Sequence, residues 1–321
     1  ISMEKRPIVV IGDANVDLVI QMPKSIDVEN IEKSQAEPNL YGGGSAANVA
    51  VAISRLGSPV EFIGGIGDDG YGQYVRDDLI SEKVGTESLH TIPNSFTPMV
   101  IATIMPDGER MIVVWPPERD ADLKLDLTHI DEDLISNSGW LHTSGMCLRA
   151  SPVRETILES MKIAKEHGIP TSLDLNLRLE LWGWEDGIRE TTEKAMTLSD
   201  YVFGNAAEEI IPISNKNNLE EALTFLSLDQ KTIVARKGSS GSTAMSDGKT
   251  IETKAYPSKA IDTLGAGDAF CGGFIVSRME GSSLEEALQW GNAVASLQIN
   301  QPGARGVPSS DQVRSVLEEN K

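Results

Sequence analysis

Short apolar runs that alternate with amphipathic stretches are the feature of this sequence that most restricts its fold. The runs begin with IVVIG at 8–12 and recur at 60–66, 139–145, 169–174, 200–204 and 231–237. Such runs are typical of buried β-strands, and apolar residues return at helical spacing between them. The helices expected there are 45–57, 70–85, 152–168 and 188–198. The alternation predicts an α/β fold, with a largely parallel sheet covered by helices on both faces.

Two segments interrupt this alternation and are predicted to form a separate small sheet. Residues 97–115 contain two β-rich runs around Pro106-Asp107-Gly108, a combination typical of a hairpin. Residues 16–41 lack the helix expected between successive parallel strands. We interpret both segments as a lid over a ligand site. A hairpin at the edge of the main sheet is the alternative, and the sequence leaves the two open.

Composition and charge narrow the classes of function. The 321 residues are 40% hydrophobic and 24% charged, as in soluble globular proteins of one or two domains. The net charge of −20 disfavours non-specific binding to nucleic acid or to an anionic membrane, so an anionic ligand needs a local site. No signal-peptide-like or transmembrane stretch is evident, and the two cysteines show no C-x-x-C spacing. A reducing, cytoplasmic location is therefore expected.

The sharpest local motif is DTLGAGDAFCGGF at 262–274, which opens a helical pattern that continues to about Met279. Gly265, Ala266 and Gly267 can present backbone N–H groups at a helix start, where phosphate oxygens are favoured. Asp268 would then lie beside a transferring phosphate, where an acceptor for a hydroxyl proton is required. The alternative is that Asp268 only caps the helix and the glycines only form a turn.

Two further motifs are suited to a polyol. Gly43 and Gly44 belong to a glycine cluster that permits close approach, and the side chain of Asn48 can donate and accept hydrogen bonds. Asn15 and Asp17 follow the first strand, at the strand end where parallel sheets bind ligands. The alternatives are a flexible loop capped by a serine and an ordinary Asp/Asn-rich turn.

Polar residues also follow two later strands. Asn205 and Glu208 are candidates for holding hydrated Mg²⁺ and phosphate, although their spacing also fits a helix capping box. Arg178, in the run DLNLR at 174–178, can bind an anion through two hydrogen bonds, and a surface ion pair is its alternative.

Two other matches to phosphate-binding patterns are rejected. Gly65-x-Gly67-x-x-Gly70 fits a dinucleotide fingerprint, but Asp68 and Asp69 would repel a pyrophosphate there. GKT at 248–250 lacks the glycine that a phosphate loop requires at position 243, so Asp247-Gly248 is predicted to form a hairpin turn.

The motifs occur together in an order that resembles the ribokinase-like (PfkB) family of sugar and nucleoside kinases, over essentially the whole chain. One family signature is matched by DTLGAGDAF at 262–270. The other is matched by Gly43, Gly44 and Asn48 through GIGDDGYG at 65–72. Asn205-x-x-Glu208 is similar to the family's Mg²⁺/phosphate motif, and Asn15 and Asp17 match positions that hold sugar hydroxyls.

This resemblance implies a doubly wound α/β kinase domain over 1–321, with lid segments at about 16–41 and 97–117 and a homodimer formed through the lid. It implies an ATP-dependent enzyme with Mg²⁺ and a small-molecule sugar substrate, in which Asp268 is the base and Gly265 to Gly267 form the anion hole. It also implies a monovalent cation such as K⁺ near Asp262. The nucleotide would lie near Asn205, Glu208, Lys237, Gly238, Gly241 and Asn292.

The acceptor is predicted from the residues that follow the strand at 169–174 and from Ser45. DLNLR with Leu181-Trp182 is similar to fructokinases and 2-keto-3-deoxygluconate kinases, so a hexose, a ketose or a sugar acid is expected. Ser45 stands where ribokinases have lysine, which argues against ribose. A nucleoside kinase of the same family and a catalytically silent sugar-binding regulator are the alternatives. A nicotinamide-dependent dehydrogenase would instead bind its cofactor at Gly65 to Gly70.

Overall fold

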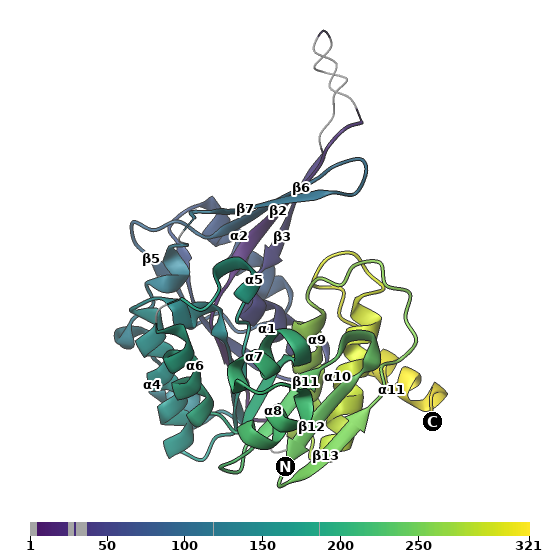
Figure 1. Ribbon diagram of the computed structural model, residues 1–321. Coiled ribbons are helices and arrows are strands. Elements are labelled where there is room, and N and C mark those ends of the chain that lie inside the picture. Colours follow the sequence, from purple (N-terminus) through teal and green to yellow (C-terminus); the bar gives the residue numbers. More distant parts are fainter. Residues whose placement is uncertain (1–4, 25–28, 30–36, 118, 186) are drawn as a thin grey trace.

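A computed structural model shows two sheets, a large one flanked by helices and a small one at one end of it (Figure 1). The structure describes residues 5–24, 29, 37–117, 119–185 and 187–321. Within them the large sheet has the strand order β13 (Lys249–Thr253), β12 (Ser242–Ser246), β11 (Thr232–Arg236), β10 (Tyr201–Asn205), β9 (Thr171–Asp174), β8 (Trp140–Ser144), β1 (Ile8–Ile11), β4 (Val60–Gly67) and β5 (Leu89–Ile92). Within this sheet β12 is antiparallel to both of its neighbours, β11 and β13, and the other neighbouring strands pair in parallel.

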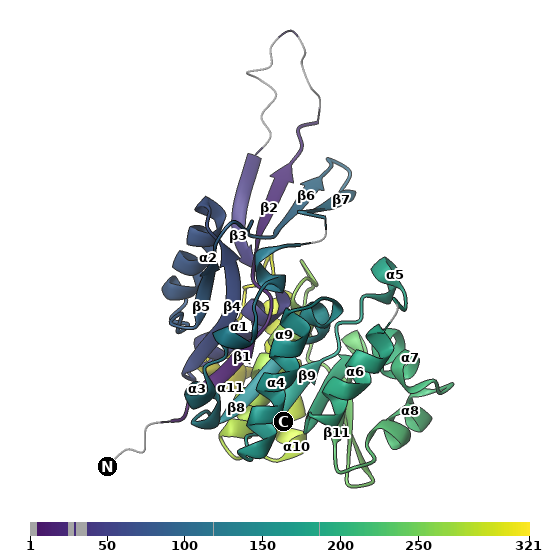
Figure 2. The same cartoon turned by 90° about the vertical axis from the view of Figure 1, so that its left-hand side faces the viewer.

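Helices cover both faces of the large sheet, as the alternation predicts (Figure 2). One face is packed by α1 (Ser45–Arg55), α2 (Gly70–Ser81), α9 (Ala266–Met279), α10 (Leu284–Gln298) and α11 (Ser310–Glu319). The other carries α3 (Glu132–Ser136), α4 (Val153–Glu166), α6 (Ile188–Thr197), α7 (Ile211–Ser214) and α8 (Leu219–Leu226). The short α5 (Leu179–Trp182) has no buried residue. Among the described residues, no helix is long and apolar enough to cross a membrane.

The apolar strands explain this two-faced arrangement. All four residues of β1 are buried, and they alternate between two clusters, with Ile8 and Val10 in one and Val9 and Ile11 in the other. A strand buried on both faces needs a continuous apolar run rather than alternation, and the sequence 8–11 provides it. The predicted strands and helices of the large sheet are confirmed to within a few residues at their ends, and the doubly wound fold is confirmed with them.

Two glycines let α9 approach its neighbours closely. A Cβ at Gly272 would lie 2.7 Å from the Cβ of Ala52 in α1, and a Cβ at Gly273 would lie 2.7 Å from Cγ2 of Val294 in α10. The Cys-Gly-Gly step of the 262–274 motif therefore serves helix packing. It brings the start of α9 against the start of α1, where the candidate site is formed.

The small sheet has the order β3 (Glu37–Gly43), β2 (Asn15–Gln21), β6 (Met99–Ile104) and β7 (Arg110–Trp115). The hairpin within 97–115 thus belongs to a separate sheet that acts as a lid, so the edge-hairpin alternative is wrong. Residues 16–24 and 37–41 of the other predicted lid segment supply most of β2 and β3, while 25–28 and 30–36 lie outside the described residues.

The base of the lid is tied to α2 by Asp69. Its carboxylate accepts a bond from the Gly72 N–H at the start of α2 and two more from the Thr97 N–H and hydroxyl, just before β6. Asp69 belongs to the rejected dinucleotide pattern, and these three bonds give its carboxylate a structural role. The predicted turn at Asp247-Gly248 is also found, joining β12 to β13 with φ of 51° and 72°, as a type I′ hairpin requires.

Candidate active site

Five strand ends meet at one edge of the large sheet. Asp13 follows β1, and Ser144, Asp174, Asn205 and Arg236 are the last residues of β8, β9, β10 and β11. These strands are parallel, so their carboxyl ends share that edge. The chain winds outward from β1 in both directions, and ligands of open α/β sheets bind at such a reversal of strand order.

Asp13 anchors the start of α1 from across the sequence. Its two carboxylate oxygens accept hydrogen bonds from the N–H groups of Ser45 at 2.8 Å and Ala46 at 3.1 Å. Gly44, with φ of 99°, is the residue before the helix and has no side chain to cap it, so the alternative of a loop capped by Ser45 is wrong. Because Asp13 satisfies those backbone donors, the Ser45 hydroxyl is left to point into the site.

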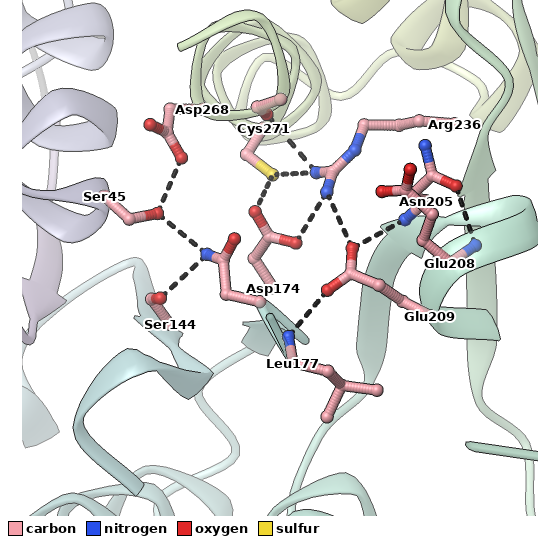
Figure 3. A network of polar contacts seen from close by, with 12 residues as sticks. Ser45, Ser144, Asp174, Leu177, Asn205, Glu208, Glu209, Arg236, Asp268 and Cys271 are labelled. Atoms are coloured by element: carbon pink, nitrogen blue, oxygen red, sulfur yellow. Dashed lines mark hydrogen bonds and ion pairs between the residues drawn. The ribbon is translucent and has the colours of Figure 1, made fainter. Parts of the chain in front are cut away.

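Asp268 lies in the first turn of α9 and faces the start of α1. Its carboxylate accepts a hydrogen bond from the Ser45 hydroxyl at 2.7 Å and another from the Asn48 amide at 3.1 Å (Figure 3 shows the first). Gly265, with φ of 77°, is the residue before α9, and no side chain caps that helix. The alternative that Asp268 is only a helix cap is therefore wrong.

The surroundings of Asp268 favour its protonated form. Burial and the nearby charge of Asp174 raise the pKa of its carboxyl to about 7, although the bonds from Ser45 and Asn48 oppose the shift. A carboxyl that titrates near neutral pH can accept a proton and release it again, which is what acid–base chemistry requires.

Asn176 links this arrangement to β8. Its amide nitrogen donates to the hydroxyls of Ser45 and Ser144, both at 2.8 Å. The Ser45 hydroxyl therefore accepts from Asn176 and donates to Asp268, which fixes its orientation. The run at 174–178 was expected to meet substrate or phosphate, whereas here Asn176 is buried and serves to orient Ser45.

Asn15 and Asp17 lie together on β2, where the lid meets the large sheet. The Asn15 amide donates to the Asp17 carboxylate at 2.7 Å, and burial raises the pKa of Asp17 to about 6. A Cβ at Gly43, the partner of Asn15 in β3, would lie 2.5 Å from that carboxylate. Gly43 thus leaves room for Asp17 rather than only for a ligand.

No sequence motif identifies Arg119 and Arg305, two arginines whose charges act on Asp17. Arg305 donates to the Asn48 side-chain oxygen at 2.8 Å and pairs with Asp78 of α2. Arg119 is nearly buried and pairs with Asp122 at 2.7 Å. The charges of both arginines lower the pKa of Asp17, against the larger effect of its burial.

Asn205 and Glu208 stand at the end of β10, but not as a capping box. The Asn205 side chain accepts from the N–H groups of Ala207 and Glu208, both at 3.0 Å, and the carboxylate that returns to the Asn205 N–H is Glu209, at 2.9 Å. A turn of π-helix, η5 (Ala206–Ile210), adds one residue to the usual spacing, which is why the predicted box with Glu208 is wrong. Glu208 itself remains exposed at the edge of the sheet.

The other residues expected near a nucleotide lie between β11 and β12 and in α10. Lys237 lies 3.6 Å from Glu252, and Gly238 and Gly241, with φ of 57° and 87°, bound the short helical turn η6 (Gly238–Ser240) between β11 and β12. Asn292 in α10 is buried, and its amide donates to the Thr253 hydroxyl at 2.7 Å and to the Lys254 carbonyl. The Asn292 donors are thus engaged within the protein.

Arg178 is exposed and, within the part of the chain that the structure describes, its side chain forms no ion pair. Its φ of 49° lies in the left-handed region, just ahead of α5. The surface ion pair offered as its alternative is therefore wrong, and the guanidinium is available to an anion.

Asp262 precedes α9 in a loop. Its carboxylate accepts from the Leu264 N–H at 3.0 Å and from the Gly303 N–H at 3.0 Å, so it joins the loop to the segment after α10. Across the described ranges, no group of three or more His, Cys, Asp or Glu side chains is arranged to hold a metal ion by itself.

The sequence of the chain matches the family described as pfkB family carbohydrate kinase over residues 5–311. It is 29% identical to the 5-dehydro-2-deoxygluconokinase of Clostridium beijerinckii, over 99% of this chain and 94% of that protein. It is 31% identical to the protein of the same name from Clostridium botulinum, over 88% of this chain and 85% of that protein.

Solved structures with this fold include kinases with bound ligands. A fructokinase from Vibrio cholerae, bound to fructose, ADP and a calcium ion, is 28% identical with a TM-score of 0.82, covering 98% of this chain and 99% of that one. A fructokinase from Xylella fastidiosa with bound ATP has a TM-score of 0.87 at 24% identity, covering 98% and 99% of the two chains, and so is alike in fold.

Proposed function

Because this chain belongs to the pfkB family of ATP-dependent carbohydrate kinases, we propose that it phosphorylates a hydroxyl of a sugar acid, with Asp268 as the base. The observation that carries the proposal is the position of Asp268, in the first turn of α9 and bonded to Ser45 and Asn48 of α1. At that position a carboxylate can receive the proton of an acceptor hydroxyl, next to backbone N–H groups suited to phosphate oxygens.

The chemistry of the base follows from its bonds. Ser45 and Asn48 hold both oxygens of the ionised carboxylate, so its orientation is set before the acceptor arrives. Its pKa of about 7 leaves a substantial ionised fraction at neutral pH while keeping the proton affinity high enough to be useful. Gly265, Ala266 and Gly267 would form the anion hole around the transferred group, because they lie at the start of α9. The Ala266 N–H donates to the Thr263 carbonyl at 3.3 Å and would have to exchange that bond for a phosphate oxygen.

The acceptor pocket would be lined by Asn15, Asp17, Gly43, Gly44 and Asn48, whose oxygens and amides suit hydroxyl groups. An acidic acceptor is supported by two features. The curated relatives are named for a gluconic acid derivative, and two arginines, Arg119 and Arg305, lie near Asp17. Arg178, exposed at the end of the β9 segment, is a third cation that could contact the acceptor or a phosphate.

The residues at the β10 end fit a nucleotide that brings its own metal. Mg²⁺ is usually held by one or two carboxylates together with phosphates and water, so the single exposed Glu208 beside Asn205 is an adequate protein contribution. Bound Mg²⁺ would offset phosphate charge during transfer. Lys237, Gly238, Gly241 and Asn292 remain our proposed neighbours of the nucleotide.

Three further expectations stay proposals. Asp262 and its loop would hold a monovalent cation such as K⁺ through remaining lone pairs and backbone oxygens. The lid would form a homodimer, since four apolar side chains of β7 are at least half exposed: Met111, Ile112, Val113 and Trp115. The whole chain would act as one kinase domain in the cytoplasm, consistent with its two free, buried cysteines.

The test is a coupled assay of ADP release with Mg²⁺-ATP over a panel of sugar acids, their neutral sugar counterparts, ketohexoses and nucleosides. Asp268→Asn should lower kcat by at least about 100-fold for the best acceptor. The matched control, Asp247→Asn in the exposed β12–β13 turn, should leave kcat unchanged.

Each outcome bears on one part of the proposal. A preference for a neutral sugar or a nucleoside would overturn the acidic acceptor. Full activity of Asp268→Asn would overturn the base. Sugar binding without turnover for every panel member would favour the silent-regulator alternative.

A further inference from the structure

Arg236, the last residue of β11, extends under the first turn of α9. Its guanidinium donates to the Asp174 carboxylate at 2.8 Å and to the Cys271 sulfur at 3.3 Å (Figure 3). It also donates to the Gly267 carbonyl at 3.3 Å. Only 14% of the side chain is exposed. The contact with α9 is close, because a Cβ at Gly267 would lie 3.2 Å from Cζ of Arg236.

The same guanidinium also approaches a second carboxylate. Glu209 lies 3.7 Å from Arg236, and it accepts hydrogen bonds from the N–H groups of Asn205 and Leu177. One cation is therefore shared between Asp174 at the end of β9 and Glu209 after β10, and it touches the helix that carries the proposed base. Buried charges require such pairing, since an unpaired carboxylate in this position would be strongly unfavourable.

We propose that Arg236 is a positioning residue for phosphoryl transfer: it cancels the charge of Asp174 behind the phosphate-facing end of α9 and fixes the Gly267 carbonyl. The inference rests on the proposed function of Asp268 and adds a residue that acts through others. Arg236 contacts the first turn of α9 through the Gly267 carbonyl, so its charge would assist an anion at the helix start without contacting the acceptor.

The charges that face Asp268 make this proposal specific. They are Asp174 beyond β9 and Asp13 beyond β1, both carboxylates that raise the pKa of Asp268. Asp13 is engaged by the backbone of α1, whereas Asp174 depends on Arg236 and a weak bond from Cys271. Loss of Arg236 leaves Asp174 unopposed, so Asp268 retains its proton to higher pH.

The experiment compares Arg236→Met, Arg236→Lys, Asp174→Asn and the double variant Asp174→Asn/Arg236→Met. For Arg236→Met, the acid limb of the pH profile of kcat/KM should move upward by roughly one pH unit, with weaker ADP binding in calorimetry. Arg236→Lys should fall between this variant and the wild type. The double variant should return the acid limb to within about 0.3 pH units of the wild type, because the Asp174 charge that acts on Asp268 is removed together with Arg236.

The double variant separates charge cancellation from a general structural role. If Arg236 is only structural, the folded Arg236→Met variant should have lower activity and an unmoved acid limb, and that result overturns the proposal. A double variant whose acid limb stays shifted also overturns it. If Arg236→Met does not fold, as judged by circular dichroism, Asp174→Asn provides the test. Its acid limb should move to lower pH, and an unmoved limb overturns the proposal. Full activity of Asp268→Asn would instead reject the proposed function, independently of these shifts.

Discussion

Replacement of Asp268 by Asn should inactivate the enzyme and also stabilise it at alkaline pH. Burial and Asp174 raise the pKa of Asp268 from 3.8 to about 7, so the ionised carboxylate is held at a cost in the folded state. A difference of about 3 pH units corresponds to about 4 kcal/mol, which is an upper limit for the gain. Asparagine keeps the shape, and it can accept from Asn48 and donate to Ser45.

The pH dependence of the gain identifies its cause. Below about pH 4 the carboxyl is protonated in both the folded and the unfolded chain and contributes nothing. Between about pH 4 and pH 7 the unfolded chain releases the proton first, so wild-type stability falls as the pH rises. Above about pH 7 the folded protein is ionised as well and the penalty is complete. The difference in unfolding free energy between Asp268→Asn and the wild type should therefore grow from about pH 4 to about pH 7 and then level off.

Urea unfolding followed by far-UV circular dichroism at several pH values measures this difference. Asp247→Asn is the control, because the same chemical change in an exposed turn should give a difference that does not vary with pH. A pH-independent difference for Asp268→Asn, or a variant less stable than the wild type at about pH 8, would refute the reasoning.

Three other substitutions test separate parts of the structure. Ser45→Ala removes a hydroxyl that donates to Asp268 and lowers its pKa, so the acid limb of kcat/KM should move to higher pH; an unmoved limb is the contrary result. Asp69→Ala removes the cap of α2 and the bonds to Thr97, and urea unfolding should show a loss of about 1–2 kcal/mol, whereas no loss means that the tie is unimportant. Ile112→Asp on the exposed face of β7 should convert a dimer to a monomer in light scattering, and a dimer that persists would place the interface elsewhere.

The fold was predictable because its signals are local. Apolar runs such as 8–12 identify strands buried on both faces, and the Asp247-Gly248 pair identifies a hairpin turn from two residues. The second sheet was predictable only as an interruption of the alternation. Whether 97–115 would pair with the main sheet or with β2 depends on contacts between distant segments, which no local pattern records.

Site residues that belong to a recognisable motif could be predicted from the sequence. Contacts between residues far apart along the chain could not. Asp268 stands out in its glycine-rich motif, but its bond to Ser45 spans 223 positions. Arg236 lies beside Lys237, which was predicted to lie near the nucleotide, but Arg236 belongs to no motif. Its ion pair with Asp174 joins residues 62 positions apart. Glu209 was missed because a π-turn shifts the expected capping spacing by one residue.

The division of the site between two sheets has a consequence for how such an enzyme can diversify. Asn15, Asp17 and Gly43 belong to the small sheet, whereas Asp174 and Arg236 end strands of the large one. With the acceptor residues assigned as we propose, mutations in the small sheet would alter which hydroxyl compound is accepted while the residues around α9 stay as they are. Of the described residues of the small sheet, Val16 alone belongs to the apolar clusters around the large sheet, so replacements elsewhere in the small sheet would leave those clusters intact.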